Sequence, residues 1–320
     1  MKASNILVLG GTGFVGQSVC EKLVERSGGA GGRVVVPTRR LAHAKHVQLL
    51  PTVQVVEADV HNDAQLARLV SDCDAVVNLI AILHGSEAQF QRVHVDLLRR
   101  LAQACRSAGV RRIIHVSALG VSASAPSRYL RSKARGEAEL MHSGLDVTVL
   151  RPSVIFGAQD KFLNLFASLQ AIAPVMPLAG ADSRYQPVWV EDMAQAVASA
   201  IDRPQSIGLT IECVGPEQYT LRQLVELAGR LSGHARPVIP LPGPLARLQA
   251  MALECLPGEP LMSRDNLDSM RVPNVATGDH PRLAVLDIRP ASLSSVAPTY
   301  LSPGRGVARL DPLRARARRP

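Results

Sequence analysis

Aromatic residues, paired cysteines and long apolar runs are what this sequence has least of. Phe, Trp and Tyr make up only 3% of its 320 residues, too few for the aromatic platforms on which single-stranded nucleic acid stacks. The five cysteines are widely spaced without a CxxC pair, and the nine histidines show no HExxH spacing. We therefore expect neither a disulfide framework nor a bound metal.

Membrane insertion and secretion are also disfavoured by what is missing. No run of about 18 apolar residues occurs, which predicts no membrane-spanning helix. The N-terminal stretch MKASNILVLGGTGFVG is interrupted by glycine and lacks a small-residue cleavage site, so we expect no signal peptide. The expected compartment is the cytoplasm, with peripheral attachment at the inner face of the membrane as an alternative.

Charge is unevenly distributed along the chain. The net charge is +9, but residues 301–320 contain six Arg and one Asp and carry +5 of it. The remaining 300 residues carry only +4, and no nucleic-acid partner is expected. Two interpretations of the basic tail stay open: a disordered, solvated end, or a segment that touches anionic lipid or an acidic partner.

The first half of the chain alternates short apolar runs with helical patterns. The expected strands are NILVLGG, RVVVPTR, VQVVEADV, DAVVNLIA, RRIIHVSA and DVTVLRPS. Continuous apolar strands separated by helices of roughly 10–15 residues are typical of a parallel sheet covered on both faces. The prediction is an α/β fold with a doubly wound Rossmann domain over residues 1–170, to which 185–230 add further elements.

The rhythm changes after about residue 170, where proline-rich connections appear. We expect a smaller, partly helical domain over 171–290 and a linker and tail over 291–320. One helix is expected to be entered through Asp192, and a capping box of Thr220 and Gln223 to open another.

One predicted helix, at residues 244–256 (PLARLQAMALECL), has a continuous apolar face. Its members recur at helical spacing: Leu245, Leu248, Met251, Ala252 and Cys255. We expect this face to be core or a lid over a pocket. The alternative is a surface that meets a membrane or a partner.

A glycine motif lies at the junction between the first strand and the first helix. Gly10, Gly13 and Gly16 form GxxGxxG in the first βαβ unit, the context that a dinucleotide fingerprint requires. The first glycine permits the tight turn, the second lets backbone approach a pyrophosphate, and the third lets helix pack on strand. The helix N-terminus would supply amides and partial positive charge to the phosphates.

The end of the second strand predicts which dinucleotide binds. NAD sites carry an acidic residue there that grips the ribose 2′-hydroxyl, whereas this chain has Arg39 and Arg40. A guanidinium would bind a 2′-phosphate, so we predict NADP(H) over NAD(H). Asp59, after the third strand, is placed to accept from the adenine amino group, or else to cap the helix near Asn62.

These motifs, with Tyr129-x-x-x-Lys133, resemble the extended or atypical short-chain dehydrogenase/reductase superfamily, of the epimerase/dehydratase-like type. The run YLRSKARGE…LRPSVIFGAQDKFLNLFA…MPLAG…RYQPVWVEDMAQAV resembles more particularly the bacterial relatives of the nucleotide-binding accessory subunit of respiratory complex I, the alpha-subcomplex subunit nine family. The likeness extends over roughly residues 4–290.

The resemblance implies a tightly bound NADPH and, in complex I, a role in stability or assembly near the membrane arm; some relatives act in or near quinone biosynthesis. It implies that Arg39 binds the 2′-phosphate. It also implies further cofactor contacts, according to the position of each residue in the family's motifs. These are Thr12, Phe14 and Val15 in the phosphate loop, Val60 beside Asp59, Ala81 at the ribose, and Pro152 and Val154 behind the nicotinamide.

The Tyr129 and Lys133 side chains share one face of a helix. Lys133 would bond the nicotinamide ribose and lower the pKa of the Tyr129 phenol, which would then exchange a proton with a substrate oxygen. In working members of the superfamily a Ser or Thr, a couple of residues beyond the first Ser after the fifth strand, orients the substrate. Here Ser117 holds the first position, but Leu119 cannot hydrogen-bond.

Two departures from the superfamily therefore favour binding over turnover. Besides the loss at Leu119, for which Ser122 or Ser124 would have to substitute, His94 replaces an Asn that many extended members carry. We expect a nucleotide-holding protein that docks on a membrane-associated respiratory or quinone-related complex. The alternative is an NADP-dependent oxidoreductase or epimerase/dehydratase acting on a lipid-, quinone- or sugar-like substrate. A transcriptional regulator of the same fold is disfavoured because no helix-turn-helix is evident.

Overall fold

A computed structural model describes residues 4–28, 31–255, 258 and 260–303 of the chain. It divides into two compact units. Unit 1 comprises the residues up to Pro152 together with Val190–Cys213 and Thr277–Arg289. Unit 2 comprises Ser153–Trp189, Val214–Ala276 and the residues from Pro290 onward.

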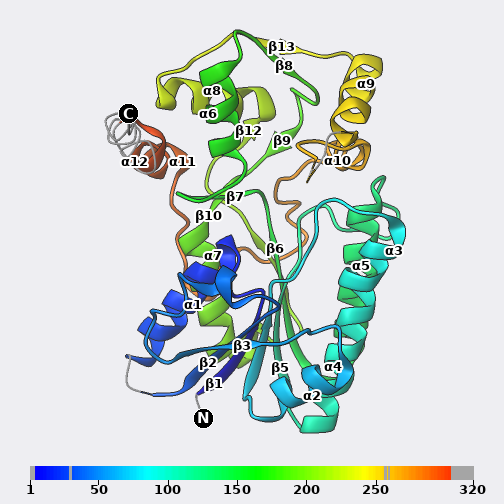
Figure 1. Cartoon of the computed structure of the whole chain (residues 1–320), viewed down its shortest axis with the longest axis vertical. Helices are drawn as coiled ribbons and strands as arrows, with labels where there is room; N and C mark the ends of the chain where they lie inside the picture. Colours follow the sequence, from blue (N-terminus) through cyan, green and yellow to red (C-terminus); the bar gives the residue numbers. More distant parts are fainter. Residues whose placement is uncertain (1–3, 29–30, 256–257, 259, 304–320) are drawn as a thin grey trace, which may run out of the picture. The chain divides into compact units, whose positions relative to one another are not determined.

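Unit 1 is built on a seven-stranded sheet in the order β11-β6-β5-β4-β1-β2-β3, in which every neighbouring pair is parallel (Figure 1). The six strands expected from the apolar runs are all present. The bounds are β1 (Asn5–Leu9), β2 (Arg33–Thr38), β3 (Val53–Glu57), β4 (Ala75–Asn78), β5 (Arg112–Val116), β6 (Asp146–Pro152) and β11 (Thr210–Cys213). Because both faces of the sheet are covered, its central strands are apolar at consecutive positions.

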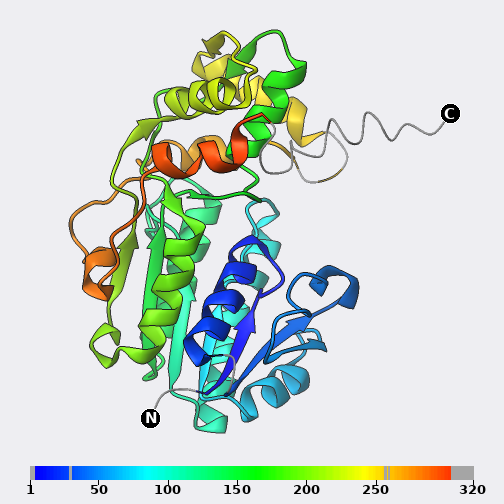
Figure 2. The same cartoon turned by 90° about the vertical axis from the view of Figure 1, so that its left-hand side faces the viewer.

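Helices cover the two faces of this sheet. Helices α1 (Phe14–Ser27) and α7 (Val190–Asp202) pack side by side on one face, as Figures 1 and 2 show. Helices α2 (Asp63–Ser71), α4 (Leu97–Ala108) and α5 (Arg128–Met141) cover the other. A short helix α3 (Glu87–Phe90) and a π-helix (Gln91–Asp96) lead into α4, and 3-10 turns lie at Leu41–Ala44, Pro204–Ser206 and Leu283–Leu286.

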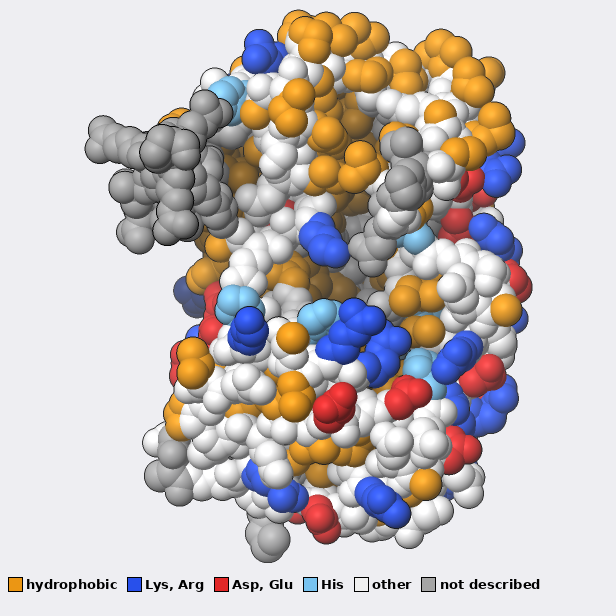
Figure 3. Space-filling model, in the orientation of Figure 1, with side chains coloured by type: hydrophobic (Ala, Val, Ile, Leu, Met, Phe, Trp, Pro, Cys, Tyr) orange, Lys and Arg blue, Asp and Glu red, His pale blue; other side chains and the backbone are white. Residues whose placement is uncertain are grey.

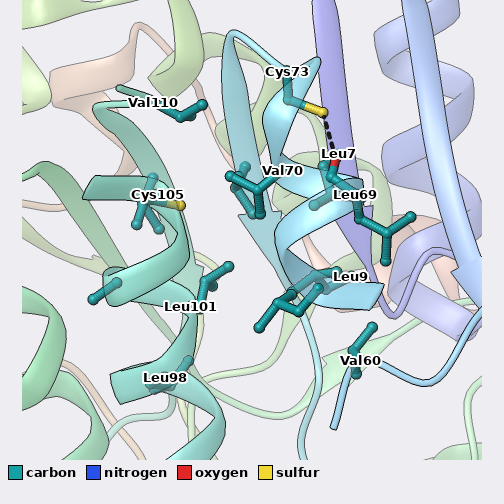
Figure 4. Close-up of a cluster of buried hydrophobic side chains, with 14 of the residues drawn as sticks. Leu7, Leu9, Val60, Leu69, Val70, Cys73, Leu98, Leu101, Cys105 and Val110 are labelled. Atoms are coloured by element: carbon teal, nitrogen blue, oxygen red, sulfur yellow. Dashed lines mark hydrogen bonds between the residues drawn. The ribbon is translucent and has the colours of Figure 1, made fainter. Parts of the chain in front are cut away.

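The core under α2 and α4 contains two of the cysteines (Figure 4). Cys73 and Cys105 are buried among Leu7, Leu69 and Leu101, and the Cys73 thiol donates to the Leu69 carbonyl at 3.1 Å. Burial raises the pKa of the Cys73 thiol to about 11 and that of Cys105 to about 12. These thiols are packing groups.

Unit 2 consists of short strand pairs and helices. Strand pairs β7 (Ile155–Phe156) with β10 (Val188–Trp189), and β8 (Met176–Leu178) with β13 (Val238–Pro240), are parallel, while β9 (Arg184–Tyr185) with β12 (Tyr219–Thr220) is antiparallel. The helices are α6 (Leu163–Ile172), α8 (Leu221–Ser232), α9 (Gly243–Glu254), α10 (Arg264–Ser269), α11 (Leu293–Val296) and α12 (Pro298–Leu301). The expected capping box of Thr220 and Gln223 opens α8.

Some expectations differ from the structure. Helix α7 begins at Val190, so Asp192 lies inside its first turn and does not precede the helix. The first segment of the Rossmann unit ends at Pro152, not at residue 170. The unit then includes α7 and β11, which lie within the expected range 185–230, and also residues 277–289, which were expected in the smaller domain.

The first part of the segment expected to be a tail, from residue 291, is folded. Residues 291–303 include α11 and α12, and their apolar side chains Leu293, Tyr300 and Leu301 are buried in a core with α6 and α8. The arginine-rich segment of the predicted tail lies outside the described residues.

Candidate functional site

The glycine motif forms a tight turn between β1 and α1. Gly10 has φ +84°, a left-handed conformation that glycine adopts without strain. The Gly13 amide donates to the Gly10 carbonyl at 3.1 Å, and Gly13 is the N-cap of α1. A Cβ atom at position 16 would overlap the Gly10 carbonyl oxygen, so only glycine lets the helix pack this closely on the turn.

The N-terminus of α1 is left open by this arrangement. Its N-cap has no side chain to satisfy the first amides, and its first turn, which includes Phe14 and Val15, contains no acidic residue. Unpaired amides and the helix dipole together suit an anion. The backbone from Gly10 to Gly16 therefore fits a dinucleotide pyrophosphate.

Two exposed arginines follow the end of β2. The Thr38 hydroxyl closes the turn, donating to the Arg40 carbonyl at 3.1 Å. Arg39 and Arg40 are exposed, and within the described part of the chain neither guanidinium forms a hydrogen bond or an ion pair. Both charges are therefore available to a ligand.

Positive charge also gathers at the end of β3. Burial and then the charge of Arg92 lower the pKa of His61. Asp59 opposes that shift, and Arg100 and Arg39 add smaller lowering effects. Arg100 donates to the His61 carbonyl at 2.7 Å. Three guanidiniums, of Arg39, Arg92 and Arg100, therefore act on His61 at the end of β3.

Asp59 does not cap helix α2, contrary to one of the two interpretations. The cap is Asn62, whose side chain accepts from the Gln65 amide at 3.1 Å. Asp59 instead accepts from the His61 amide at 3.0 Å, holding the loop after β3. The next residue, Val60, is buried in the core (Figure 4), so its side chain anchors the loop after β3 to that core.

The Tyr–Lys pair lies in the first two turns of α5, which is capped by Ser127. The Lys133 ammonium is buried and donates to the Val116 carbonyl, at the end of β5, at 3.0 Å. Burial lowers the pKa of Lys133 to about 8, and Glu137 partly opposes that shift. The pKa of Tyr129 is raised to about 12 by burial, so the expected lowering by Lys133 is not present in this structure. Desolvation disfavours the charged form of the phenol.

The serines expected near this pair differ in burial and in hydrogen bonding. Ser117 is buried and its hydroxyl has no hydrogen-bond partner. Leu119 is buried, and its amide donates to the Pro152 carbonyl at 2.9 Å. Ser122 and Ser124 are exposed and hydrogen-bond to each other at 3.1 Å. The orphaned Ser117 hydroxyl is the one of these groups that still lacks a partner.

His94, noted from sequence only as a replacement, is buried at a junction of three segments. Its Nε2 accepts from the Ile82 amide at 3.1 Å, next to Ala81, and its Nδ1 contacts the Ser132 hydroxyl at 2.8 Å. Ser132 in turn donates to the Tyr129 carbonyl at 2.7 Å. Burial, and then the charge of Lys133, lower the pKa of His94 to about 3, so the ring is neutral. The loop after β4 is thereby fixed to the helix of the Tyr–Lys pair.

A second buried histidine was not singled out from the sequence. His115 lies on β5 inside the apolar run RRIIHVSA, and its Nδ1 accepts from the Asn78 side chain at 3.1 Å. Its Nε2 therefore carries the proton and has no partner. The only sequence signal was a histidine inside a predicted core strand.

Two residues assigned to the nicotinamide belong to different units. Pro152 ends β6 in unit 1, whereas Val154 belongs to unit 2, where its amide donates to the Asn274 side chain at 3.0 Å. Their joint contact with a cofactor stays a prediction.

The part of the chain that the structure describes contains neither a metal site nor a membrane-spanning helix. Over the described ranges, no group of three His, Cys, Asp or Glu side chains could hold a metal ion. Among those same residues, no helix combines the length and apolarity needed to cross a bilayer.

Comparisons with known proteins identify the family. Residues 10–166 match the family model described as NAD(P)H-binding. The chain is 33% identical over 303 residues to the NADH dehydrogenase [ubiquinone] 1 alpha subcomplex subunit 9 of Rattus norvegicus, covering 89% of this chain and 76% of the relative. It is 30% identical to a ceramide reductase of Caulobacter vibrioides, over 75% of this chain and 74% of that protein.

The fold recurs among solved structures. A UDP-glucuronic acid 4-epimerase of Bacillus cereus, in complex with UDP-glucuronic acid and NAD, superposes with a TM-score of 0.65 at 19% identity, covering 93% of this chain and 98% of that one. The resemblance inferred from sequence is thus confirmed. This chain belongs to the family of NAD(P)H-binding proteins that includes the alpha subcomplex subunit 9 of mitochondrial NADH dehydrogenase.

Proposed function

We propose that the chain holds NADPH tightly in unit 1 and acts as a structural or assembly component of a membrane-associated respiratory or quinone-related complex, with little or no turnover. Such a role would keep it at the inner face of the cytoplasmic membrane. The name of the rat relative, a subunit of NADH dehydrogenase, supports this role.

The observation that carries the proposal is that the glycine turn suits a dinucleotide, whereas the position expected to orient a substrate has no hydrogen-bonding side chain. The turn from Gly10 to Gly16 has open amides, whereas the position expected to orient a substrate is Leu119, which is buried. The two serines that would have to substitute for it, Ser122 and Ser124, are both exposed and hydrogen-bond to each other. These features favour holding a nucleotide over transforming a substrate.

The preference for NADPH rests on the end of β2. Arg39 and Arg40 have no carboxylate partner within the described ranges, and no acidic residue stands where an NAD site would carry one. Two free guanidiniums would bind a 2′-phosphate through charge-assisted hydrogen bonds. The binding of NAD(H) with lower affinity remains compatible with the same cradle.

A second candidate is a reductase acting on a lipid-like carbonyl. Two observations favour it: one relative of the chain is named ceramide reductase, and Tyr129 and Lys133 are both present on one face of α5. A bound NADPH would supply a hydride to such a substrate. Lys133 would hold the nicotinamide ribose, and the phenol of Tyr129 would give its proton to the substrate oxygen.

One experiment separates the two candidates. The purified protein is denatured, and the nucleotide it releases is identified by mass spectrometry. Tyr129→Phe and Gly16→Ala variants are then tested for complementation of a deletion strain. We expect NADPH in the wild type, full complementation by Tyr129→Phe, and loss of both nucleotide and complementation in Gly16→Ala, because its methyl group would overlap the Gly10 carbonyl.

Two results would contradict the structural role. Tyr129→Phe that keeps its nucleotide but fails to complement would establish catalysis. A folded Gly16→Ala protein that has lost its nucleotide yet complements would show that holding NADPH is not what the cell requires.

A further inference from the structure

Helix α9 of unit 2 carries its large apolar side chains on the outside. Its inward positions are the small residues Ala246 and Ala250, both buried. Leu245, Leu248 and Met251 point outward and are 51%, 56% and 47% exposed. The apolar face predicted from the sequence is therefore real, but it is neither core nor covered by any described residue.

The apolar surface continues beyond this helix. Strand β13, next to α9 in the chain, exposes Ile239 (48%), and Ile172, at the end of α6, is 86% exposed. Strand β8 pairs with β13, and its Pro177 carbonyl accepts from the Gln249 side chain of α9 at 3.2 Å. Apolar side chains gather over β8, β13 and α9 in the upper part of Figure 3. We call the exposed side chains of Ile172, Ile239, Leu245, Leu248 and Met251 the apolar face of unit 2.

The edge of this face is basic. Residues 229–255 contain Arg230, Arg236 and Arg247, and Glu254 is their one acidic residue. Glu254 is already paired with Arg264 at 2.9 Å. Arg236 donates to the Gln170 carbonyl, so that its charge has no carboxylate partner within the described part of the chain. Arg247, on α9 itself, lies 3.8 Å from Asp268 of α10, so within the described residues the arginines at this edge without a carboxylate partner are Arg230 and Arg236. An exposed apolar face beside unpaired positive charge suits a surface that offers both hydrocarbon and anions.

We propose that the apolar face of unit 2 binds the surface of an anionic lipid bilayer, with α9 lying in the plane of the interface. Twelve residues make a helix of about 18 Å, too short to cross a hydrocarbon core of about 30 Å but suited to lying within its boundary. Leu245, Leu248 and Met251 would enter the acyl region, while Arg236 would meet a lipid phosphate.

Charge favours a bilayer over a second copy of the chain. Pairing two identical faces about a twofold axis would bring the unpaired arginines of both copies together, while Asp268 and Glu254 are already paired with Arg247 and Arg264. The inference goes beyond the proposed function, because it concerns unit 2 and does not depend on which nucleotide unit 1 holds.

Flotation with lipid vesicles tests this proposal on the full chain. Vesicles of phosphatidylcholine alone are compared with vesicles containing 30% phosphatidylglycerol. The test variant is Leu248→Glu/Met251→Glu, and the matched control is Leu49→Glu/Ile207→Glu, which alters two exposed apolar residues of unit 1. We expect the wild type and the control to float with the anionic vesicles and the test variant to bind at least 10-fold more weakly, while all three bind NADPH alike.

A probe near α9 locates the contact. Cys255 is exposed at the end of the helix while Cys20, Cys73, Cys105 and Cys213 are buried, so an environment-sensitive fluorophore can be attached there selectively. Its emission should shift to the blue on anionic vesicles in the wild type and not in the test variant.

Three outcomes would overturn the proposal. One is that neither vesicle binds the wild type. Another is that the test variant binds as the wild type does, which would place the contact elsewhere. The third is that the wild type is a dimer that the two glutamates dissociate, which would assign the face to a second copy. A loss of NADPH binding in the wild type would instead count against the proposed function alone.

Discussion

The Nδ1 atom of His94 and the hydroxyl of Ser132 lie 2.8 Å apart, and this contact fixes the protonation of the ring. The single Ser132 proton is donated to the Tyr129 carbonyl, so His94 must donate from Nδ1. Nε2 is then free to accept from the Ile82 amide, as observed at 3.1 Å. His94 is a positioning residue that joins the loop after β4 to the start of α5.

Replacing His94 should loosen both segments. His94→Ala leaves the Ile82 amide without an acceptor, and a buried unsatisfied group costs about 1–3 kcal/mol. The Ser132 hydroxyl keeps its bond to the Tyr129 carbonyl but loses the one that it accepts from His94. His94→Phe keeps the volume of the ring but not its hydrogen bonds, and it therefore separates packing from bonding. We expect both variants to lower the free energy of unfolding in urea by at least about 1 kcal/mol and to bind NADPH more weakly.

The matched control is His46→Ala, which alters an exposed histidine of the same unit. This variant should change neither the free energy of unfolding nor the affinity for NADPH. NADPH affinity that is unaltered in His94→Phe would show that the His94 hydrogen bonds do not position the nucleotide site.

The two arginines after β2 should determine cofactor preference. Each charge-assisted hydrogen bond to a 2′-phosphate is worth about 1.5–3 kcal/mol, or roughly 10- to 100-fold in affinity. Arg39→Ala should weaken NADPH by that factor and leave NADH nearly unchanged, as measured by fluorescence titration.

Arg33→Ala, at the opposite end of the same strand, is the control and should affect neither nucleotide. Wild-type protein that binds NADH as tightly as NADPH would contradict the assignment of Arg39.

The sequence was sufficient to predict the sheet and the glycine turn because both depend on local patterns. Strands that are buried on both faces appear in the sequence as apolar runs. Gly16 packs against the Gly10 carbonyl, so glycine recurs at a fixed distance along the chain. The boundary at Pro152 could not be read in this way. Residues 277–289 rejoin unit 1 through contacts such as the one from Thr277 to Glu212 at 2.8 Å, 65 positions apart in the chain.

Helix α9 shows a different reason for failure. Both of its faces are apolar, so helical periodicity does not decide which one is buried. Close packing selected the small residues Ala246 and Ala250 and left Leu248 outside. The contacts of His94 with Ile82 and Ser132 could not be predicted either, because a single histidine in a polar helix does not indicate which residues its side chain will contact.

Helix α12 packs in the apolar core of unit 2 and also makes a buried side-chain hydrogen bond. The Tyr300 hydroxyl donates to Asp160 at 3.1 Å, and the same carboxylate accepts from the Leu163 amide at 2.6 Å. Tyr300→Phe removes one donor to a charged acceptor and should lower the free energy of unfolding by about 1.5–3 kcal/mol. Thermal unfolding measures the loss.

Tyr219→Phe is the matched control, since its hydroxyl pairs with Glu217 at an exposed site, where such contacts contribute little. An equal loss in the two variants would mean that the Tyr300 bond does not stabilise α12 specifically.

Lys133 should make the nucleotide-free protein more stable in mild alkali. Its pKa is about 8 in the folded chain because burial disfavours the ammonium, against 10.5 for an unburied lysine. Between these two values the unfolded chain holds a proton that the folded chain has released, so the free energy of unfolding rises with pH across that window. Below pH 8 the cost of burying the charge is fully present, as much as about 3 kcal/mol.

Lys133→Met removes that titration while filling similar space. Other groups also titrate in alkali, with Tyr129 and the buried thiols acting in the opposite direction, but they are common to both proteins and cancel in the difference. Subtracting the wild-type free energy of unfolding from that of Lys133→Met should therefore give a positive value at pH 7 that shrinks steadily from pH 8 to pH 10.5. Urea titrations at five pH values measure it. A difference that stays constant with pH would mean that Lys133 is not desolvated in the folded protein, and that its charge is available to the phenol of Tyr129 after all.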